Sequence, residues 1–437
     1  MAVLAQVVKF IPPKHIDVLA RSYNIQTRSF SATSHVVAML YAHLSHALSL
    51  NDICDALQNH SGTLSQIRNC TPPTRNGLSY ANRTRNADMA EKLFWVVYYD
   101  LMEQYPNFFT SSRSYPGLPY RFRRTIYAFD STTVSLTANS IGWAQHRRHK
   151  AALKMHNGLN MQSFLPEFLI VKSAKDSDPK TAWELCSQLK DGNIAVFDKA
   201  YVDFSHLNHL HCRGISWVTR PKENMLYKVM GQHTSAAEEQ DTTATRKVMG
   251  QHRLLGCKKL KRGKKRRYVR KKIRIISDEQ ILLTGVKTPE SYPRELRLVT
   301  TEVEVKKKMT RMSFITNNFD WSAYTVCEVY RARWGVEVFF KELKQTLQLA
   351  DFLGYNENAV RWQIWMALLT YLLLRFIAWS NQWKHTFSRL FTLIRGVLWN
   401  YFDLSSILAA CDTMGRRGSF TIRGSPENAY QILFDFA

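Results

Sequence analysis

The sequence predicts an α/β protein whose mixed β-sheet core is interrupted by a β-rich insertion and flanked by helical regions at both ends. Between about residues 121 and 220, short apolar strands alternate with amphipathic helices, which is typical of α/β folds. Two acidic residues, Asp130 and Asp198, belong to this part, and a third candidate, Glu337, lies far downstream. The gap before Glu337 is much longer than a strand-to-helix connection needs, so a folded segment must be inserted there.

Composition limits the class of protein. The 437 residues are 45% hydrophobic and 12% aromatic, which indicates a globular chain long enough for two or three domains. Sixty Lys and Arg against 35 Asp and Glu give a net charge of +25. Such an excess favours a polyanionic partner such as nucleic acid, although charge alone also allows a membrane surface.

Neither secretion nor membrane insertion is predicted. The N-terminus lacks the basic and apolar regions of a signal peptide. The longest apolar run, 365–379, is short for a membrane span and contains Arg375, so we expect a buried helix. Seven scattered cysteines without a CxxC pair indicate neither a disulfide framework nor a zinc ribbon. We therefore expect a cytoplasmic protein without a membrane partner.

The first 75 residues are predicted to be helical. Their apolar residues recur at helical spacing at Val36, Val37, Leu40, Leu44 and Leu48. Ser49 or Asn51 is the expected N-cap of the helix that follows. A turn-rich joint at 71–77 separates this region from a helical connector at 76–120.

The order of elements predicts the fold of the core. We expect a strand through Asp130, strands at 153–161 and 167–173, a helix at 179–190, a strand into Asp198, a helix at 203–212 and a strand at 215–219. Three strands, helix, strand, helix, strand is the order of an RNase H-like fold. Its sheet would hold Asp130 and Asp198 on adjacent strands, with the helix of Glu337 laid across it.

The insertion, at 221–312, is predicted to be β-rich and basic. Residues 296–305 alternate apolar and polar side chains, which is typical of half-exposed strands. The hexapeptide KVMGQH occurs at 228–233 and again at 247–252. Two copies are too few for a solenoid, so we interpret them as a local duplication or a hairpin pair.

A dense basic tract lies in the same insertion. Residues 258–274 include twelve basic side chains, among them Lys264, Lys265, Arg266 and Arg267. A solvated charge run is one interpretation, and the tract also looks like a nuclear-localisation signal. We favour contact with the DNA backbone, because such density would release many counterions.

A second cluster, His206, His209, His211 and Cys212, has the residue types of a zinc site. No second ligand pair lies at the usual spacing, so the zinc interpretation is disfavoured.

One helix between 313 and 380 is predicted to carry the chemistry. Tyr330, Arg333, Glu337 and Lys344 are spaced i, i+3, i+7 and i+14, which places them on one face of a single helix. Apolar side chains at other helical positions can pack on the opposite side; they are Val336, Phe339, Phe340 and Leu343. A carboxylate among groups that bind phosphate suggests phosphoryl transfer.

These residues resemble a known family. Tyr330-x2-Arg333-x3-Glu337-x6-Lys344 resembles the YREK signature of DDE transposases from the fourth large family of bacterial insertion sequences. The supporting blocks are Asp130-Ser131-Thr132, Asp198-x-Ala200-Tyr201-x2-Phe204 and Ala81-Asn82-x2-Arg85, which resemble the two aspartate blocks and a block that often precedes the catalytic domain. The signature and the two aspartate blocks, in this order, are together far more specific than any one of them.

The resemblance implies an activity and a set of ligands. Asp130, Asp198 and Glu337 would be catalytic and would bind two Mg²⁺ ions, with Mn²⁺ as a substitute. The protein would cleave DNA at insertion-sequence ends and transfer the released 3′-OH to target DNA. Arg333 and Lys344 would hold phosphates.

Partners and domain roles follow from the same resemblance. Tyr330 would contact the DNA strand, and Trp334 or Trp321 could stack on a flipped base. The substrate would be double-stranded DNA with terminal inverted repeats, bound by a homodimer. The expected segments are an end-binding domain (1–75), a connector (76–120), the first part of the core (121–220), the insertion (221–312), the second part of the core (313–380) and a helical region for dimerisation (381–437).

Two alternatives remain open. A transposase-derived protein could bind DNA without cleaving it, although the three intact acids argue against this. A structure-selective nuclease could share the RNase H-like fold, although it needs neither the helical signature nor the long insertion.

Overall fold

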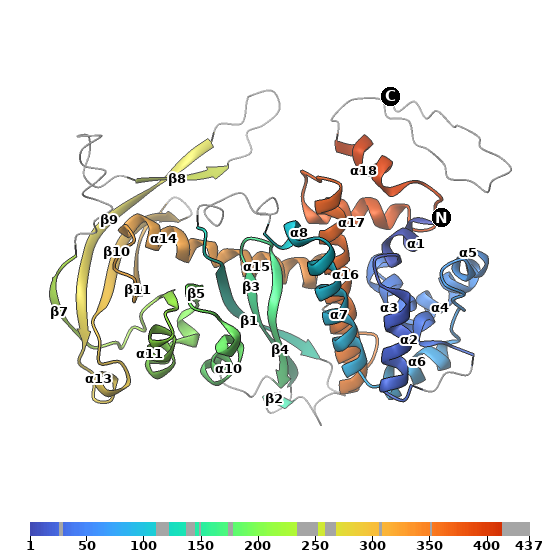
Figure 1. Cartoon of the computed structure of the whole chain (residues 1–437), viewed down its shortest axis with the longest axis horizontal. Helices are drawn as coiled ribbons and strands as arrows, with labels where there is room; N and C mark the ends of the chain where they lie inside the picture. The colour runs from blue at the N-terminus through green and yellow to red at the C-terminus, as the bar shows by residue number, and fades with distance from the viewer. Residues whose placement is uncertain are drawn as a thin grey trace.

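The computed structural model describes residues 1–25, 29–110, 122–136, 145–147, 150–173, 178–233, 252–257, 268–305, 308–349 and 352–412. Two parts lie side by side (Figure 1). One is a mixed sheet with helices on its faces, and the other is a bundle of helices drawn from both ends of the chain.

Helices fill the N-terminal region, as the sequence predicts. They are α1 (Val3–Val8), α2 (Pro13–Ser22), α3 (Ala32–Ser45), α4 (Leu50–Asn59), α5 (Ser61–Ser65), α6 (Arg75–Thr84), α7 (Asp88–Gln104) and α8 (Pro106–Thr110). The expected cap at Ser49 is confirmed. Its hydroxyl accepts from the Asp52 backbone N–H at 3.2 Å, and the Asp52 carboxylate accepts from the Ser49 N–H at 2.8 Å. This reciprocal capping box explains why α4 begins at Leu50.

The bundle is organised around α16 (Glu357–Ser380), the buried helix expected over 365–379. Among the described residues, it is the one helix long and apolar enough to cross a membrane, yet most of it is buried inside the protein. It packs against α3 and α7. Because neighbouring helices already cover its apolar surface, α16 behaves as the core helix of the bundle.

The C-terminal region joins the same bundle. Its described helices are α17 (Phe387–Gly396) and α18 (Leu404–Asp412). The start of the chain bonds to the segment between them, since Val3 N–H donates to the Asn400 carbonyl at 3.0 Å and Leu4 N–H donates to the Leu398 carbonyl at 2.9 Å. The expected end-binding and dimerisation segments therefore pack against each other.

The first half of the sheet has the predicted order of elements. These are β1 (Ile126–Leu136), β2 (Gln145–Arg147), β3 (Lys150–Asn160), β4 (Leu165–Ser173), α10 (Asp178–Leu185), β5 (Ile194–Phe197), α11 (Phe204–Cys212) and β6 (Ser216–Thr219). Strand β1 is central, antiparallel to β3 and parallel to β5, and β5 is parallel to β6. With β4 on the far side of β3, this is the predicted mixed sheet of an RNase H-like fold.

The insertion is β-rich, and it extends the same sheet. Its elements are β7 (Tyr227–Gln232), β8 (His252–Cys257), β9 (Tyr268–Leu283), α13 (Thr288–Ser291), β10 (Leu296–Val305) and β11 (Lys308–Thr316). The last strand returns to the core, where Ile315 and Thr316 pair with Thr219 and Val218 of β6. The strands thus continue in the order β6-β11-β10-β9-β7, with β8 also paired to β9.

Parts of the insertion named above lie outside the described residues. The first KVMGQH copy forms most of the edge strand β7, whereas the second copy is described only at His252. The basic side chains Lys264, Lys265, Arg266 and Arg267 also fall outside the described residues.

The signature segment differs from the single helix that the spacing predicts. It consists of α14 (Ala323–Ala332), α15 (Trp334–Lys341) and a π-helical turn, η6 (Glu342–Thr346). At the break, Arg333 N–H donates to the Tyr330 carbonyl at 3.1 Å, a tighter i to i−3 bond. The π turn then shifts Lys344 around the axis relative to an ideal α-helix.

Two cores lie on opposite faces of the sheet. Alternate residues of β1 divide between them, with Ile126 and Ala128 on one side and Tyr127 and Phe129 on the other. Helices α14, α15 and α16 pack in the first core (Figure 1). By the same alternation Asp130 belongs to the Ala128 face, toward α15.

Candidate active site

Asp130 and Asp198 come from adjacent parallel strands, as expected. Phe129 of β1 pairs with Phe197 of β5, so the next position on each chain carries a carboxylate. Asp198 follows the end of β5 and precedes a short 3₁₀ helix, η5 (Lys199–Tyr201). Asp130 instead lies inside β1, because that strand continues past the acid by pairing with β3.

Arg333 joins the first and third acids. One guanidinium nitrogen donates to Asp130 Oδ2 at 2.7 Å, and the other terminal nitrogen donates to Glu337 Oε1 at 2.6 Å. The side chains of Arg333, Asp130 and Glu337 are 14, 19 and 35% exposed. One cation thus lies between two partly buried carboxylates, which strengthens each ionic hydrogen bond.

The electrostatic state of Asp130 shows that the acids act on one another. Burial raises the pKa of Asp130 from its ordinary value of 3.8 to about 6, against the lowering effects of Arg333 and the Ser131 N–H. The negative charges of Asp198 and Glu337 raise it further. Surroundings of this kind disfavour the ionised carboxylate and favour binding of an additional positive charge.

Tyr330 and Lys344 lie on either side of this group. The Tyr330 ring packs 4.8 Å from that of Phe314, with the Arg333 guanidinium 5.7 Å from its centroid. Burial raises the pKa of the Tyr330 phenol. The Lys344 ammonium donates to the Thr133 carbonyl on β1 at 2.6 Å, and burial lowers the pKa of this lysine. Arg333 and Lys344 therefore bond to β1 at Asp130 and Thr133, whereas Tyr330 packs against β11.

Asn157 is a residue of the site that the sequence interpretation missed. It is fully buried on β3, directly opposite Asp130 in the antiparallel register. Neither atom of its amide has a hydrogen-bond partner within the described part of the chain. A buried unpaired amide is costly. The sequence did carry a signal: Asn157 is an amide between Met155 and Leu159, which are apolar and would share its face of the strand.

The two tryptophans proposed for base stacking differ. Trp334 follows Arg333 and is 59% exposed, so its ring is available to a ligand. Trp321 is partly buried, packs 5.8 Å from Phe122 and uses its carbonyl to accept from Arg297. The geometry favours Trp334.

The histidine cluster on α11 has structural contacts. His206 is buried beside the ring of Trp183, at 4.9 Å, and burial lowers its pKa to about 4. His211 Nδ1 hydrogen-bonds to the Tyr292 hydroxyl at 2.6 Å. These contacts support the sequence argument against a zinc site.

The acids suit a divalent metal in chemistry, although Arg333 engages two of them. Carboxylate oxygens without histidine or cysteine are the donors that Mg²⁺ prefers. Among the described residues, no three acidic, histidine or cysteine side chains are gathered closely enough to hold an ion. Arg333 already occupies one oxygen of Asp130 and one of Glu337. The donor set fits, provided that Arg333 releases these oxygens.

Comparison with family models gives two matches. The model described as Transposase DDE domain matches residues 121–373, which is more than half of the chain and includes all three acids. A model described as a domain of unknown function (DUF4372) matches residues 1–67.

Three relatives are similar to more than half of the chain. A Sinorhizobium fredii protein named as a transposase, y4zB, is 26% identical over 65% of this chain and 70% of its own length. A Geobacillus stearothermophilus protein named as a transposase for insertion sequence element IS5377 is 26% identical over 59% of this chain and 58% of its own. A Synechocystis protein named as a transposase for insertion sequence element IS4SA is 23% identical over 58% of this chain and 60% of its own length. The matches thus span less than two thirds of the last two relatives.

Among solved structures, the piggyBac transposase synaptic complex with hairpin DNA is similar with a TM-score of 0.43 and 8% identity. The alignment covers 95% of this chain and 82% of that chain.

Proposed function

Since this chain belongs to the transposase DDE domain family, whose members are enzymes that act on DNA, we propose that it cleaves DNA at the ends of an insertion sequence and joins the released strand to target DNA. The observation that carries the proposal is the Arg333 bridge between Asp130 and Glu337, beside Asp198 on the adjacent strand. The signature supports membership of the YREK type.

The three carboxylates would hold the metal. Asp130 would contribute to both ions, and Asp198 and Glu337 would each complete one site. Two Mg²⁺ ions, or Mn²⁺ in their place, supply activation of an attacking oxygen and stabilisation of a leaving oxygen when bound. The partly buried setting of Asp130 and Glu337 keeps the local dielectric low and strengthens these interactions.

The cationic residues would position the DNA strand. Once its carboxylate partners are engaged elsewhere, the planar guanidinium of Arg333 can fork onto a phosphate. Lys344 is held beside β1 by Thr133 and provides a second charge along the same strand. Tyr330 offers a hydroxyl, and the exposed ring of Trp334 offers a surface for a flipped base.

The wider assembly follows from the same activity. The substrates would be double-stranded DNA with terminal inverted repeats and a target DNA, in the bacterial cytoplasm. Synapsis of two element ends would make a homodimer the natural active unit, as the resemblance to the family implies. The helical region 1–75 would bind the element end, the basic side chains Lys264, Lys265, Arg266 and Arg267 would contact the DNA backbone, and region 381–437 would contribute to dimerisation.

The test is Mg²⁺-dependent nicking and joining of a labelled duplex that carries the element's own end. Wild type should form product, and Asp130→Ala should lose at least about a thousandfold in rate while still binding the duplex. Glu103→Ala, which removes an exposed carboxylate from α7, outside the proposed end-binding region, serves as the charge-matched control. Equal product from Asp130→Ala would exclude this site, and binding by wild type without product would favour a DNA-binding derivative.

A further inference from the structure

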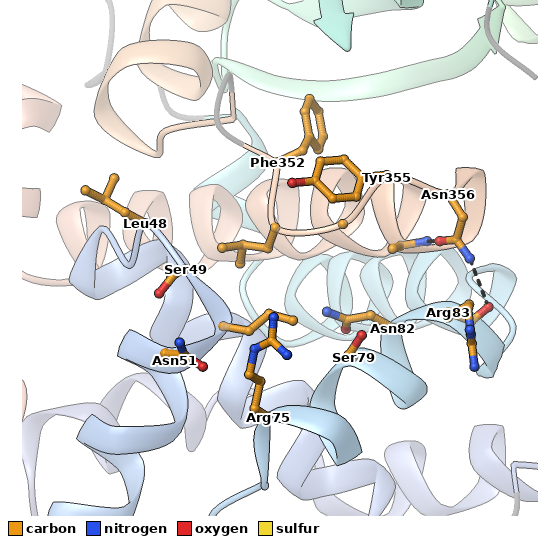
Figure 2. Close-up of a pocket in the computed structure, with 14 residues that line it drawn as sticks. Leu48, Ser49, Asn51, Arg75, Ser79, Asn82, Arg83, Phe352, Tyr355 and Asn356 are labelled. Atoms are coloured by element: carbon orange, nitrogen blue, oxygen red, sulfur yellow. Dashed lines mark hydrogen bonds between the residues drawn. The ribbon is translucent and has the colours of Figure 1, made fainter. Parts of the chain in front are cut away.

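A hollow lies in the helical part of the molecule. It has a volume of about 450 Å³ and lies between α4, α6 and the segment that leads into α16 (Figure 2). This volume is within the range of sites for small molecules and cofactors. None of the three acids or the signature residues lines it, so it is separate from the candidate active site.

The charged side chains of this pocket are all basic. Arg75 and Arg83 lie two turns apart on α6 with Ser79 between them, so the three share one helix face. Neither guanidinium forms an ion pair with a carboxylate in the described part of the chain. The nearby Asp52 carboxylate already accepts from the N–H groups of Leu48 and Ser49 at 3.1 and 2.8 Å. The pocket therefore offers two positive charges that no described carboxylate pairs with.

The backbone adds to this positive character. Helices α4, α6 and α16 all begin at the pocket, where Ser49, Arg75 and Asn356 are lining residues. The N-terminus of a helix carries a partial positive charge and favours anions. Three such ends together with two guanidinium groups favour a phosphate more strongly than any one of them alone.

The walls are held together before any ligand binds. The Asn356 amide donates to the Arg83 carbonyl at 3.4 Å, the dashed line in Figure 2. The Asn358 amide donates to the carbonyls of Asn82 and Arg85 at 2.9 and 2.6 Å. These bonds tie α6 to the start of α16, so the pocket is preorganised.

Aromatic and apolar side chains form the rest of the lining. Phe352 and Tyr355 lie near each other along one side, and Leu48 lies at another edge (Figure 2). Leu48 is 71% exposed and Tyr355 is 56% exposed. Bases of any sequence can stack on an exposed aromatic ring such as that of Tyr355. An anion-binding wall facing an aromatic surface matches a nucleotide, which has a phosphate at one end and a base at the other.

We propose that this pocket is a separate DNA contact that holds one nucleotide of a strand, with the phosphate on Arg75 and Arg83 and the base against Tyr355. The inference rests on the proposed function, because it takes DNA as the substrate. The pocket's aromatic wall follows the signature segment in the chain, since Phe352 comes shortly after η6 and Lys344.

Binding without catalysis provides the first test. A fluorescein-labelled oligothymidylate strand is titrated with wild type, with Arg75→Ala/Arg83→Ala and with Lys180→Ala/Lys190→Ala. The control pair removes the same charge from exposed positions outside region 1–75, and neither residue lines the pocket. We expect the pocket variant to bind about tenfold more weakly, from the loss of two phosphate contacts, and the control to change less than about twofold.

Photocrosslinking locates the strand. An oligothymidylate containing 5-iodouracil should crosslink to Tyr355 or Phe352 in wild type, and Tyr355→Leu should reduce the yield while circular dichroism remains that of wild type. Competition with dTMP separates two sources of the same chemistry. A strand that binds far more tightly than dTMP supports the DNA contact, whereas equal affinity indicates a site for free nucleotides and overturns it.

Two results would overturn the pocket proposal without touching the active site. These are equal binding by the pocket and control variants, and crosslinks that map only to other parts of the chain. Cleavage that depends on Asp130, measured in the same preparations, reports separately on the proposed function. If wild type binds no oligonucleotide and no duplex, both proposals fail.

Discussion

Two arginines in this protein meet carboxylates in opposite ways. Arg297, on β10, is fully buried and binds Asp278 of β9 with two parallel bonds, Nε to Oδ1 at 2.8 Å and Nη2 to Oδ2 at 2.6 Å. Its remaining nitrogen donates to the carbonyls of Asn318 and Trp321. Arg333 divides its two terminal nitrogens between Asp130 and Glu337, and its buried Nε has no partner within the described residues.

The difference distinguishes a structural ion pair at Arg297 from the ion pairs of Arg333, which we propose to be functional. At Arg297, one acid meets one base and each guanidinium nitrogen donates at least one hydrogen bond, so removal of either partner leaves a buried charge. At Arg333, one cation faces two bonded acids with Asp198 nearby, and the local charge is negative. Such an arrangement is incomplete without a further cation, which is expected where a metal and a phosphate must bind in turn.

Breaking the structural pair should give the largest change in stability. Asp278→Ala leaves the Arg297 guanidinium buried and unpaired, which should lower the free energy of unfolding by about 3–5 kcal/mol. Urea unfolding followed by circular dichroism measures this. Glu302→Ala is the control, because its contact with Arg274 is a 4.0 Å surface pair worth less than about 1 kcal/mol. A loss below about 1 kcal/mol for Asp278→Ala would remove the distinction between the two arginines.

Ionisation of Asp130 should lower the stability of the folded protein as pH rises. Folded Asp130, with its pKa near 6, retains a proton between about pH 4 and 6 that the unfolded chain releases, so stability falls across this window. Asp130→Asn cannot ionise and should match wild type below pH 4. Above pH 6.5 it should be more stable, by on the order of 2 kcal/mol. A stability difference that does not vary between pH 4 and 7 would contradict the assignment.

Arg333 should compete with a divalent cation for the carboxylates. Arg333→Ala frees one oxygen on Asp130 and one on Glu337, so Mn²⁺ should bind about fivefold more tightly, corresponding to about 1 kcal/mol for a partly screened pair. Calorimetric titration of each protein with Mn²⁺, in the absence of DNA, measures this affinity. Arg331→Ala is the matched control, since that residue pairs only at 3.5 Å with Glu328. Weaker Mn²⁺ binding by Arg333→Ala would show that the arginine supports the metal site and does not compete.

Much of the local structure could be predicted from the chain. The alternating residues 296–305 form β10 with those bounds, and Ser49 caps α4, because strand alternation and helix capping depend on neighbours in sequence. The order of elements also predicted that Asp130 and Asp198 would lie on adjacent strands. Spacing alone could not predict the break at Arg333, because a tight turn and a π turn arise where a helix packs across strands of the sheet.

Local patterns in the sequence thus defined the kinds of element, their order and the residue types of the site, since periodicity and motif spacing lie within short stretches of chain. The tertiary structure decided which of these elements contact one another. Strand β11 returns to β6 and extends the core sheet, and α1 bonds to residues 398–400. Asn157, whose amide has no partner among the described residues, lies opposite Asp130. Each of these depends on residues far apart in the chain, whose pairing is selected by burial and hydrogen bonding in the complete fold.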